Sequence, residues 1–225
     1  MGGLILQSGA GLAFMLLMLA LPLLLAAGTT DFWQAWLYLA VFGGCSLLVT
    51  LYLLRYDQSL LARRVKAGPI AEQQRSQKVF QSLASLCFFA QFLVAGLDRR
   101  FGWSHIPDAY SIVSDVVVAL GFGVVFLTFR ANSYASAVIE VASEQRVISS
   151  GPYRFVRHPM YAGASVLLVF TPLALGSWWA LPPALLLIVV VALRAVEEEK
   201  FLAAELVGYE TYRQRVPSRL VPFVW

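Results

Sequence analysis

The sequence GPYRFVRHPMYAG, residues 151–163, lies between two long apolar runs, and we interpret the rest of the chain outward from it. Glycines stand at both of its ends, and basic and aromatic side chains lie between them. Pro152 and Pro159 lack an amide donor and disfavour helix in the residue before them. Such a backbone cannot be exposed to lipid, because its polar groups would have no hydrogen-bond partners there. We therefore expect the segment at a membrane–water boundary, where a charged ligand could be held.

The composition indicates a membrane protein with several spans. The 225 residues are 59% hydrophobic and 13% charged, whereas soluble domains are about 45–50% apolar and about 25% charged. The net charge of +4 beside membrane spans favours contact with anionic lipid headgroups and argues against nucleic acid as a partner. Cys45 and Cys87 fall in apolar runs, so we expect buried thiols and neither a disulfide nor a metal site. No Lys or Arg precedes the first apolar run, so we expect it to be retained as a span.

The apolar runs predict an all-α fold, a polytopic transmembrane helical bundle of about six membrane helices. The runs are residues 10–27, 32–54, 79–97, 112–130, 160–176 and 180–196. Only the short segment Gly176–Trp179 connects the last two, which predicts a tight helical hairpin with Pro182 and Pro183 in the first turn of its second arm. Each arm is short for a span, so a five-helix bundle with a half-embedded hairpin remains an alternative. We divide the chain into a four-helix transmembrane region, 1–131, and a C-terminal core of motif loop, hairpin and tail helix, 132–225.

The charge distribution predicts the orientation of the bundle. If both termini are cytoplasmic, the segments between spans that face the cytoplasm, together with Arg130 at the edge of one of them, hold every Lys and Arg except Arg99 and Arg100. This is the bias expected of loops kept on the cytoplasmic side. Five tryptophans then fall at the outer interface, where aromatic belts occur: Trp33, Trp36, Trp103, Trp178 and Trp179. We expect an integral, multi-pass membrane protein with a cytoplasmic pocket.

The short hairpin brings the motif close to the charged segment RAVEEEKFL, residues 194–202. Arg194 and Glu198 are four residues apart and share a helix face. Three consecutive glutamates, 197–199, cannot all point the same way, so one or two of them are expected to face the basic motif or a bound cation. Alternatively this segment is a solvated helical turn, and Arg157 and His158 contact lipid phosphate or cap a helix. Convergence of the two charged groups favours a functional site.

Three segments occur in order in the C-terminal part of the chain. They are VISSGPYRFVRHPMYAG, then R-x-x-x-E-E-x-x-L (Arg194, Glu198, Glu199 and Leu202), then GYETYRQRVP. Together they resemble the isoprenylcysteine carboxyl methyltransferase family. Related membrane methyltransferases that act on phospholipid amines share much of this pattern. The resemblance covers about residues 132–222. It implies an integral membrane enzyme that uses S-adenosyl-L-methionine and takes a lipophilic small-molecule or prenylated substrate from the membrane lipids.

The resemblance also implies roles for particular residues. Arg194 and Glu198 would be catalytic, with Arg194 facing the substrate and Glu198 also facing the cofactor. A lid or tail helix would carry Tyr209, Tyr212, Arg213 and Arg215. The other cofactor-binding residues would be Gln145, Arg146, Val147, Ile148, Tyr153, His158, Pro159, Met160 and Tyr161; no metal is implied.

The residue types fit this chemistry. A carboxylate such as Glu198 suits an ammonium group, and the faces of Tyr153 or Tyr161 suit a cation. His158, or backbone amides of residues 145–148, could meet a carboxylate or an adenine edge. A carboxylate acceptor needs no base, only a cation such as Arg194 to aim it, whereas an amine acceptor would need Glu198 or Glu199 as base. We therefore expect carboxyl methylation. A phospholipid amine N-methyltransferase, an NADPH-dependent membrane reductase, and a small transporter or scaffold are the alternatives.

Four other polar residues are given structural interpretations. We expect Asp115 in the first turn of its helix, where a carboxylate suits the helix dipole. Gln91 is expected to hydrogen-bond between helices, and His105 to be solvated in an outer loop. Asn132 could line the pocket or cap the fourth long helix.

Overall fold

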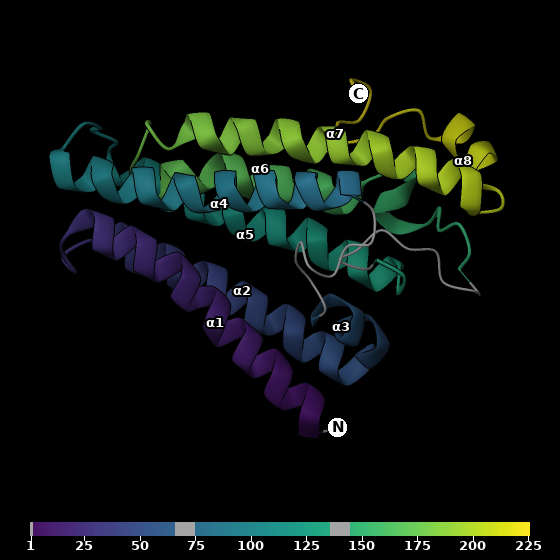
Figure 1. Cartoon of the computed structure of the whole chain (residues 1–225), viewed down its shortest axis with the longest axis horizontal. Coiled ribbons are helices and arrows are strands. Elements are labelled where there is room, and N and C mark those ends of the chain that lie inside the picture. Colours follow the sequence, from purple (N-terminus) through teal and green to yellow (C-terminus); the bar gives the residue numbers. More distant parts are fainter. Residues whose placement is uncertain (1, 66–74, 136–144) are drawn as a thin grey trace.

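The computed structural model describes residues 2–65, 75–135 and 145–225, and these ranges form helices and no strands (Figure 1). The all-α fold class is thus confirmed. The chain order is α1 (Gly2–Ala27), α2 (Trp33–Tyr56), α3 (Gln58–Val65), α4 (Arg75–Phe101), α5 (Asp108–Ala131), the 3₁₀ turn η1 (Gly151–Arg154), α6 (Pro159–Ala174), α7 (Leu181–Glu205) and α8 (Tyr209–Arg215).

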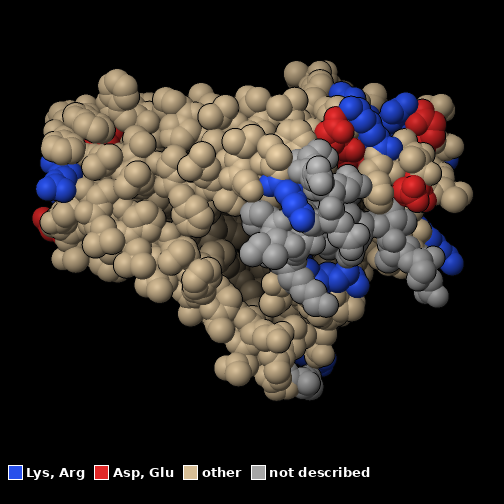
Figure 2. Space-filling view, in the orientation of Figure 1, with Lys and Arg blue, Asp and Glu red and all other residues tan. Residues whose placement is uncertain are grey.

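Four of the described helices, α1, α2, α4 and α5, are long and apolar enough to cross a membrane. The apolar helix α6 is shorter, with 16 residues. Helix α7 has 25 residues, but its apolar part ends at Leu193 and charged residues follow. Figure 2 shows charged side chains mainly at the two ends of the main body on this face, with a broad uncharged band between. The helical membrane bundle is confirmed, and full crossing by the hairpin arms stays a prediction.

The predicted hairpin is present in α6 and α7, which lie side by side (Figure 1). Gly176 turns the chain with a φ of 73°, a left-handed conformation that favours glycine. Pro182 and Pro183 fall in the first turn of α7, as expected. The turn is tied to α4, because the carboxylate of Asp98 accepts hydrogen bonds from the hydroxyl of Ser177 and from the amide of Ser104, the latter at 2.7 Å.

Helices α5 and α6 pack backbone to backbone at Gly121 and Gly163. A Cβ added to either glycine would lie 2.9 Å from the carbonyl oxygen of the other. Small residues permit this close approach of membrane helices. Helix α2 packs on the same pair, and the hydroxyls of Tyr38 and Thr171 lie 3.1 Å apart in the buried core. This packing fixes the start of α6, which carries the motif, beside the end of α5.

Several local expectations need correction. Asp115 is not in the first turn, because α5 begins at Asp108; its side chain is buried two turns into the helix. Gln91 is buried, but its amide hydrogen-bonds to nothing in the described ranges, so its expected interhelical bond is wrong. Helix α1 begins earlier than the apolar run, and α3 was not predicted. His105 is exposed, as expected.

Candidate functional site

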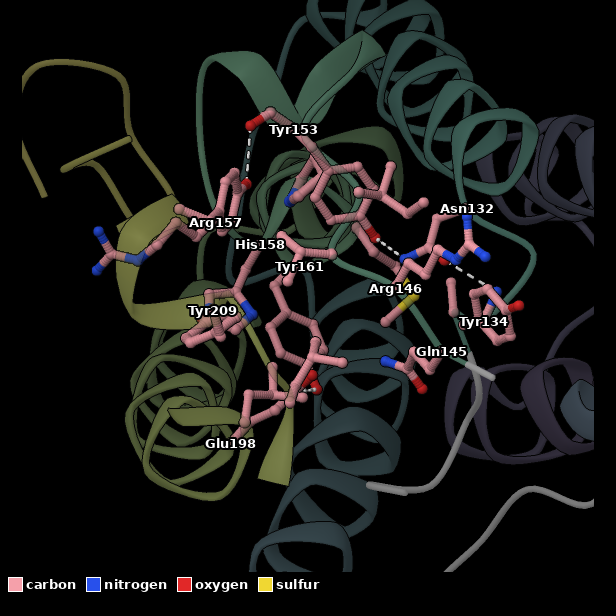
Figure 3. A pocket seen from close by; sticks show the side chains of 18 of the residues that line it. Asn132, Tyr134, Gln145, Arg146, Tyr153, Arg157, His158, Tyr161, Glu198 and Tyr209 are labelled. Atoms are coloured by element: carbon pink, nitrogen blue, oxygen red, sulfur yellow. Dashed lines mark hydrogen bonds between the residues drawn. The ribbon is translucent and has the colours of Figure 1, made fainter. Parts of the chain in front are cut away.

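A cavity lies where the motif, the charged half of α7 and α8 meet (Figure 3). All eleven residues assigned above to the catalytic or cofactor-binding groups line it, together with both tail tyrosines. Its lining is Asn132, Tyr134, Ala135, Gln145, Arg146, Val147, Ile148, Tyr153, Arg157, His158, Pro159, Met160, Tyr161, Arg194, Glu198, Leu202, Leu206, Tyr209 and Tyr212. The predicted convergence of motif and α7 is therefore found, while the roles of the individual residues stay predictions.

The register of α7 separates the three consecutive glutamates. Glu198 lines the cavity with Arg194, one turn earlier on the same helix face. The hydroxyl of Tyr161 donates a hydrogen bond of 2.7 Å to Glu198 Oε2, and the two side chains point toward each other in Figure 3. Glu197 is partly exposed and pairs with Lys200 at 2.5 Å. Glu198 is thus the glutamate of this trio that lines the cavity.

Glu199 is buried and serves as an anchor for the motif. Its Oε1 lies 2.6 Å from Arg157 Nε and 3.2 Å from His158 Nε2, and its Oε2 lies 2.9 Å from Arg219 Nε. Burial opposes ionisation of Glu199, but the hydrogen bonds from these three side chains outweigh it and lower its pKa to about 2. One carboxylate therefore holds three basic side chains from two segments of the chain.

The C-terminal segment completes the anchor of the motif. The amides of Arg157 and His158 donate to the carbonyls of Ser218 and Arg219, at 2.9 and 3.0 Å. The Arg157 guanidinium also donates to the carbonyls of Val216 and Pro217, both at 2.7 Å. Arg157 is therefore buried and hydrogen-bonded inside the protein, which corrects the alternative that it contacts lipid phosphate.

Aromatic rings form one wall of the cavity. The rings of His158 and Tyr161 are nearly parallel, with an interplanar angle of 11° and centroids 5.6 Å apart. The Tyr153 hydroxyl accepts a 2.9 Å hydrogen bond from the amide of Asn132, so Asn132 both lines the cavity and follows the last residue of α5. Burial raises the pKa of Tyr153 to about 12, which keeps it a neutral hydrogen-bonding group.

Helix α8 covers the cavity, and a hydrogen bond holds it to the motif. The Tyr212 hydroxyl donates to the carbonyl of Tyr153 at 2.8 Å, and Tyr209 and Tyr212 are both buried. Arg213 pairs with Glu210 on the exposed side, and neither it nor Arg215 lines the cavity. The tail helix is thus where the resemblance placed it, but only its tyrosines reach the cavity.

Arg194 lines the cavity, and Arg64 lies outside the lining but contacts one of its residues, Met160. Arg194 donates through Nη1 to the side-chain oxygen of Gln81 on α4. Arg64 of α3 lies over the Phe129 ring at 4.7 Å, with its Nη1 3.3 Å from Met160 Sδ. Sequence reasoning missed Arg64, because nothing in the sequence around it indicates contact with the motif. It also missed Arg219, which no motif marks.

The cavity has a volume of about 100 Å³ and is partly open to its surroundings. Sites for drug-sized ligands usually have about 300–1,000 Å³. The chemistry of the lining suits a charged aromatic ligand, but a ligand as large as a nucleoside would extend beyond this volume or displace part of the wall.

The comparisons with known proteins give one finding. The family model for phospholipid methyltransferase matches residues 110–206, from the first turn of α5 to the end of α7. The match contains the hairpin, the motif and both charged residues of α7 that line the cavity. No curated protein matches the chain.

Proposed function

Because residues 110–206 belong to the phospholipid methyltransferase family, which indicates a membrane methyltransferase, we propose that the cavity binds S-adenosyl-L-methionine and that the acceptor is a lipophilic carboxylate. The observation that carries the proposal is that an acidic and a basic side chain, Glu198 and Arg194, lie on one face of α7 and line one cavity. S-adenosyl-L-methionine supplies a methyl group on a positively charged sulfur.

The lining offers complementary groups for three parts of this cofactor. Glu198 provides a carboxylate for its amino group. The stacked rings of His158 and Tyr161 and the nearby Tyr153 provide aromatic faces for its cationic centre. The segment 145–148 provides backbone groups for its adenine edge. His158 Nε2 is directed at Glu199, so we assign this ring a stacking role and not the contact with the cofactor's carboxylate.

Arg194 supports a carboxylate acceptor. It lies one turn nearer the apolar half of α7 than Glu198 does, so an acceptor arriving from the bilayer meets the guanidinium first. A planar guanidinium can hold a carboxylate by two parallel hydrogen bonds and aim it. Because a carboxylate is already a nucleophile, correct aim is the main requirement, and aim can lower a barrier by as much as about 7–11 kcal/mol.

Because the volume of the cavity is small, we infer that α8 moves when the cavity fills. A single side-chain hydrogen bond joins this seven-residue helix to the motif. The Tyr212 hydroxyl donates it to the Tyr153 carbonyl. Opening there would enlarge the cavity without breaking the buried cluster around Glu199. Closure of α8 over the ligands would then exclude water and strengthen the charged contacts.

Binding of S-adenosylhomocysteine to the purified full chain in detergent tests the cofactor assignment. We expect saturable binding by calorimetry, weakened about 10- to 100-fold by Glu198→Gln, since a hydrogen bond to a charged group contributes about 1.5–3 kcal/mol. Arg213→Gln is the control, because this exposed arginine does not line the cavity. Absence of saturable binding by the wild-type chain rejects the proposal, and displacement by NADPH would instead favour a membrane reductase. Equal activity of Arg194→Ala, Glu198→Ala and wild type would favour a transporter or scaffold.

A phospholipid amine is the second candidate acceptor. The family description and the carboxylate of Glu198, which could take a proton from an ammonium group, favour it. Labelled methyl groups transferred in native membranes discriminate the two acceptors. Methyl esters release the label in base, whereas methylamines keep it.

A further inference from the structure

A second, apolar groove lies on the other side of the motif turn. It has a volume of about 630 Å³ and is formed by α5, η1, the start of α6 and the C-terminal segment. Its walls include Val124, Leu127, Phe155, Ala162 and Leu220. Among the described residues, only Pro159 lines both this groove and the cavity described above. The groove is therefore a separate site, divided from the cavity by the turn that begins α6.

The groove extends from the apolar part of the bundle to a charged end. Val124 and Leu127 lie in the last two turns of α5, just before Arg130, so we place this part at the inner edge of the hydrocarbon. Arg154 lines the groove on η1 and is exposed. Leu127 and Phe155 are 48% and 59% exposed, so the groove opens to the surroundings of the protein.

We propose that this groove binds an anionic phospholipid of the surrounding bilayer. Its acyl chain lies against Val124, Leu127 and Ala162, and its phosphate meets the guanidinium of Arg154. Apolar walls that lead to a single exposed arginine match the two parts of such a lipid. An arginine near the membrane surface favours an anionic headgroup by about 1 kcal/mol, roughly a fivefold preference in binding. This site is independent of the methyl acceptor, since it needs no access to Glu198 or Arg194.

A matched control for Arg154 is Arg55, in the last turn of α2. Arg55 is also exposed and lies over the ring of its neighbour, Tyr56, at 5.4 Å, as Arg154 lies over Phe155 at 5.9 Å. Arg55 lines a smaller recess of about 180 Å³. Replacing either arginine removes the same charge, but only Arg154 lines the large groove.

The test uses the full chain purified in detergent and mixed with equal amounts of palmitoyl-oleoyl phosphatidylglycerol and phosphatidylcholine. Native mass spectrometry measures the lipid that stays bound. We expect the wild type to retain phosphatidylglycerol in preference, and Arg154→Gln to lower its retention about fivefold. Arg154→Lys and Arg55→Gln should resemble wild type, and Ala162→Trp, which fills the groove, should lower retention of both lipids.

Two outcomes overturn the proposal: Arg154→Gln retains as much phosphatidylglycerol as wild type, or Arg55→Gln loses as much as Arg154→Gln. Equal thermal melting of the lipid-free variants checks that each is folded. If Ala162→Trp fails this check, the comparison of Arg154→Gln with Arg154→Lys still decides.

Discussion

Arg157 and Glu199 form a buried ion pair, in which Nε and Oε1 are 2.6 Å apart and the side chains are 3% and 4% exposed. The pair joins the motif to α7 across 42 positions of sequence. In the sequence, His158 follows Arg157 and Glu198 precedes Glu199. The pair therefore fixes the separation of the two cavity walls to which His158 and Glu198 belong. The site thus depends on an anchor whose members do not carry the proposed chemistry.

Removing one member of this pair should destabilise the fold strongly. Glu199→Gln leaves the Arg157 guanidinium buried without its counter-charge, which costs about 3–5 kcal/mol in comparable cases. Chemical denaturation in detergent micelles measures the loss of unfolding free energy. Glu210→Gln is the control, because its exposed pair with Arg213 should contribute no more than about 1 kcal/mol. Similar losses for the two variants would show that the buried pair is not an anchor.

Acid should destabilise the protein through Glu199. Its pKa is about 2 in the folded protein against an ordinary 4.5, so the folded state binds this proton less readily than the unfolded state. Its stabilising effect is complete above about pH 4.5 and is lost as the pH falls toward 2, a total of about 3 kcal/mol. We expect the difference in unfolding free energy between wild type and Glu199→Gln to shrink over this range. A difference that stays constant from pH 6 to pH 3 would contradict the prediction.

The backbone crossing of α5 and α6 predicts opposite effects for two neighbouring glycines. A Cβ on Gly121 would lie 2.9 Å from the Gly163 oxygen and 3.1 Å from Leu167, whereas a Cβ on Gly123 meets nothing within 4 Å. Gly121→Ala should therefore separate the helices and cost about 1–3 kcal/mol. Gly123→Ala should be neutral or stabilise by up to about 1 kcal/mol through helix propensity. Thermal melting compares them, and equal melting temperatures would argue against the close crossing.

Loosening the contact of α8 should change access to the cavity. Tyr212→Phe removes the hydrogen bond to the Tyr153 carbonyl but keeps the buried ring. We expect faster association and dissociation of S-adenosylhomocysteine, because opening no longer breaks a bond of about 0.5–1.5 kcal/mol. Stopped-flow binding measures both rates, with Arg213→Gln as the control on the exposed side of the same helix. Unchanged rates would mean that ligands enter elsewhere.

The outcome for individual residues shows where sequence reasoning succeeds. The periodicity and spacing of the motif and of Arg194 and Glu198 were enough to predict that these residues meet at one cavity. They could not identify Glu199 as the buried member of the glutamate trio, because that depends on which face of α7 packs against the motif and the C-terminal segment. Asp115 and Gln91 were misinterpreted for a similar reason: a helix start and a hydrogen-bond partner depend on neighbours that the local sequence does not show.

By itself, the amino-acid sequence determined a helical membrane bundle, a tight terminal hairpin and the set of residues at its charged end, since hydropathy and helical spacing act locally along the chain. Tertiary structure alone decided that Arg219 joins Arg157 and His158 around Glu199, that Tyr212 holds the tail helix to the motif, and that a second groove lies behind Pro159. These features arise where segments distant in sequence pack together, and the free energy of such packing is not carried by any one of them.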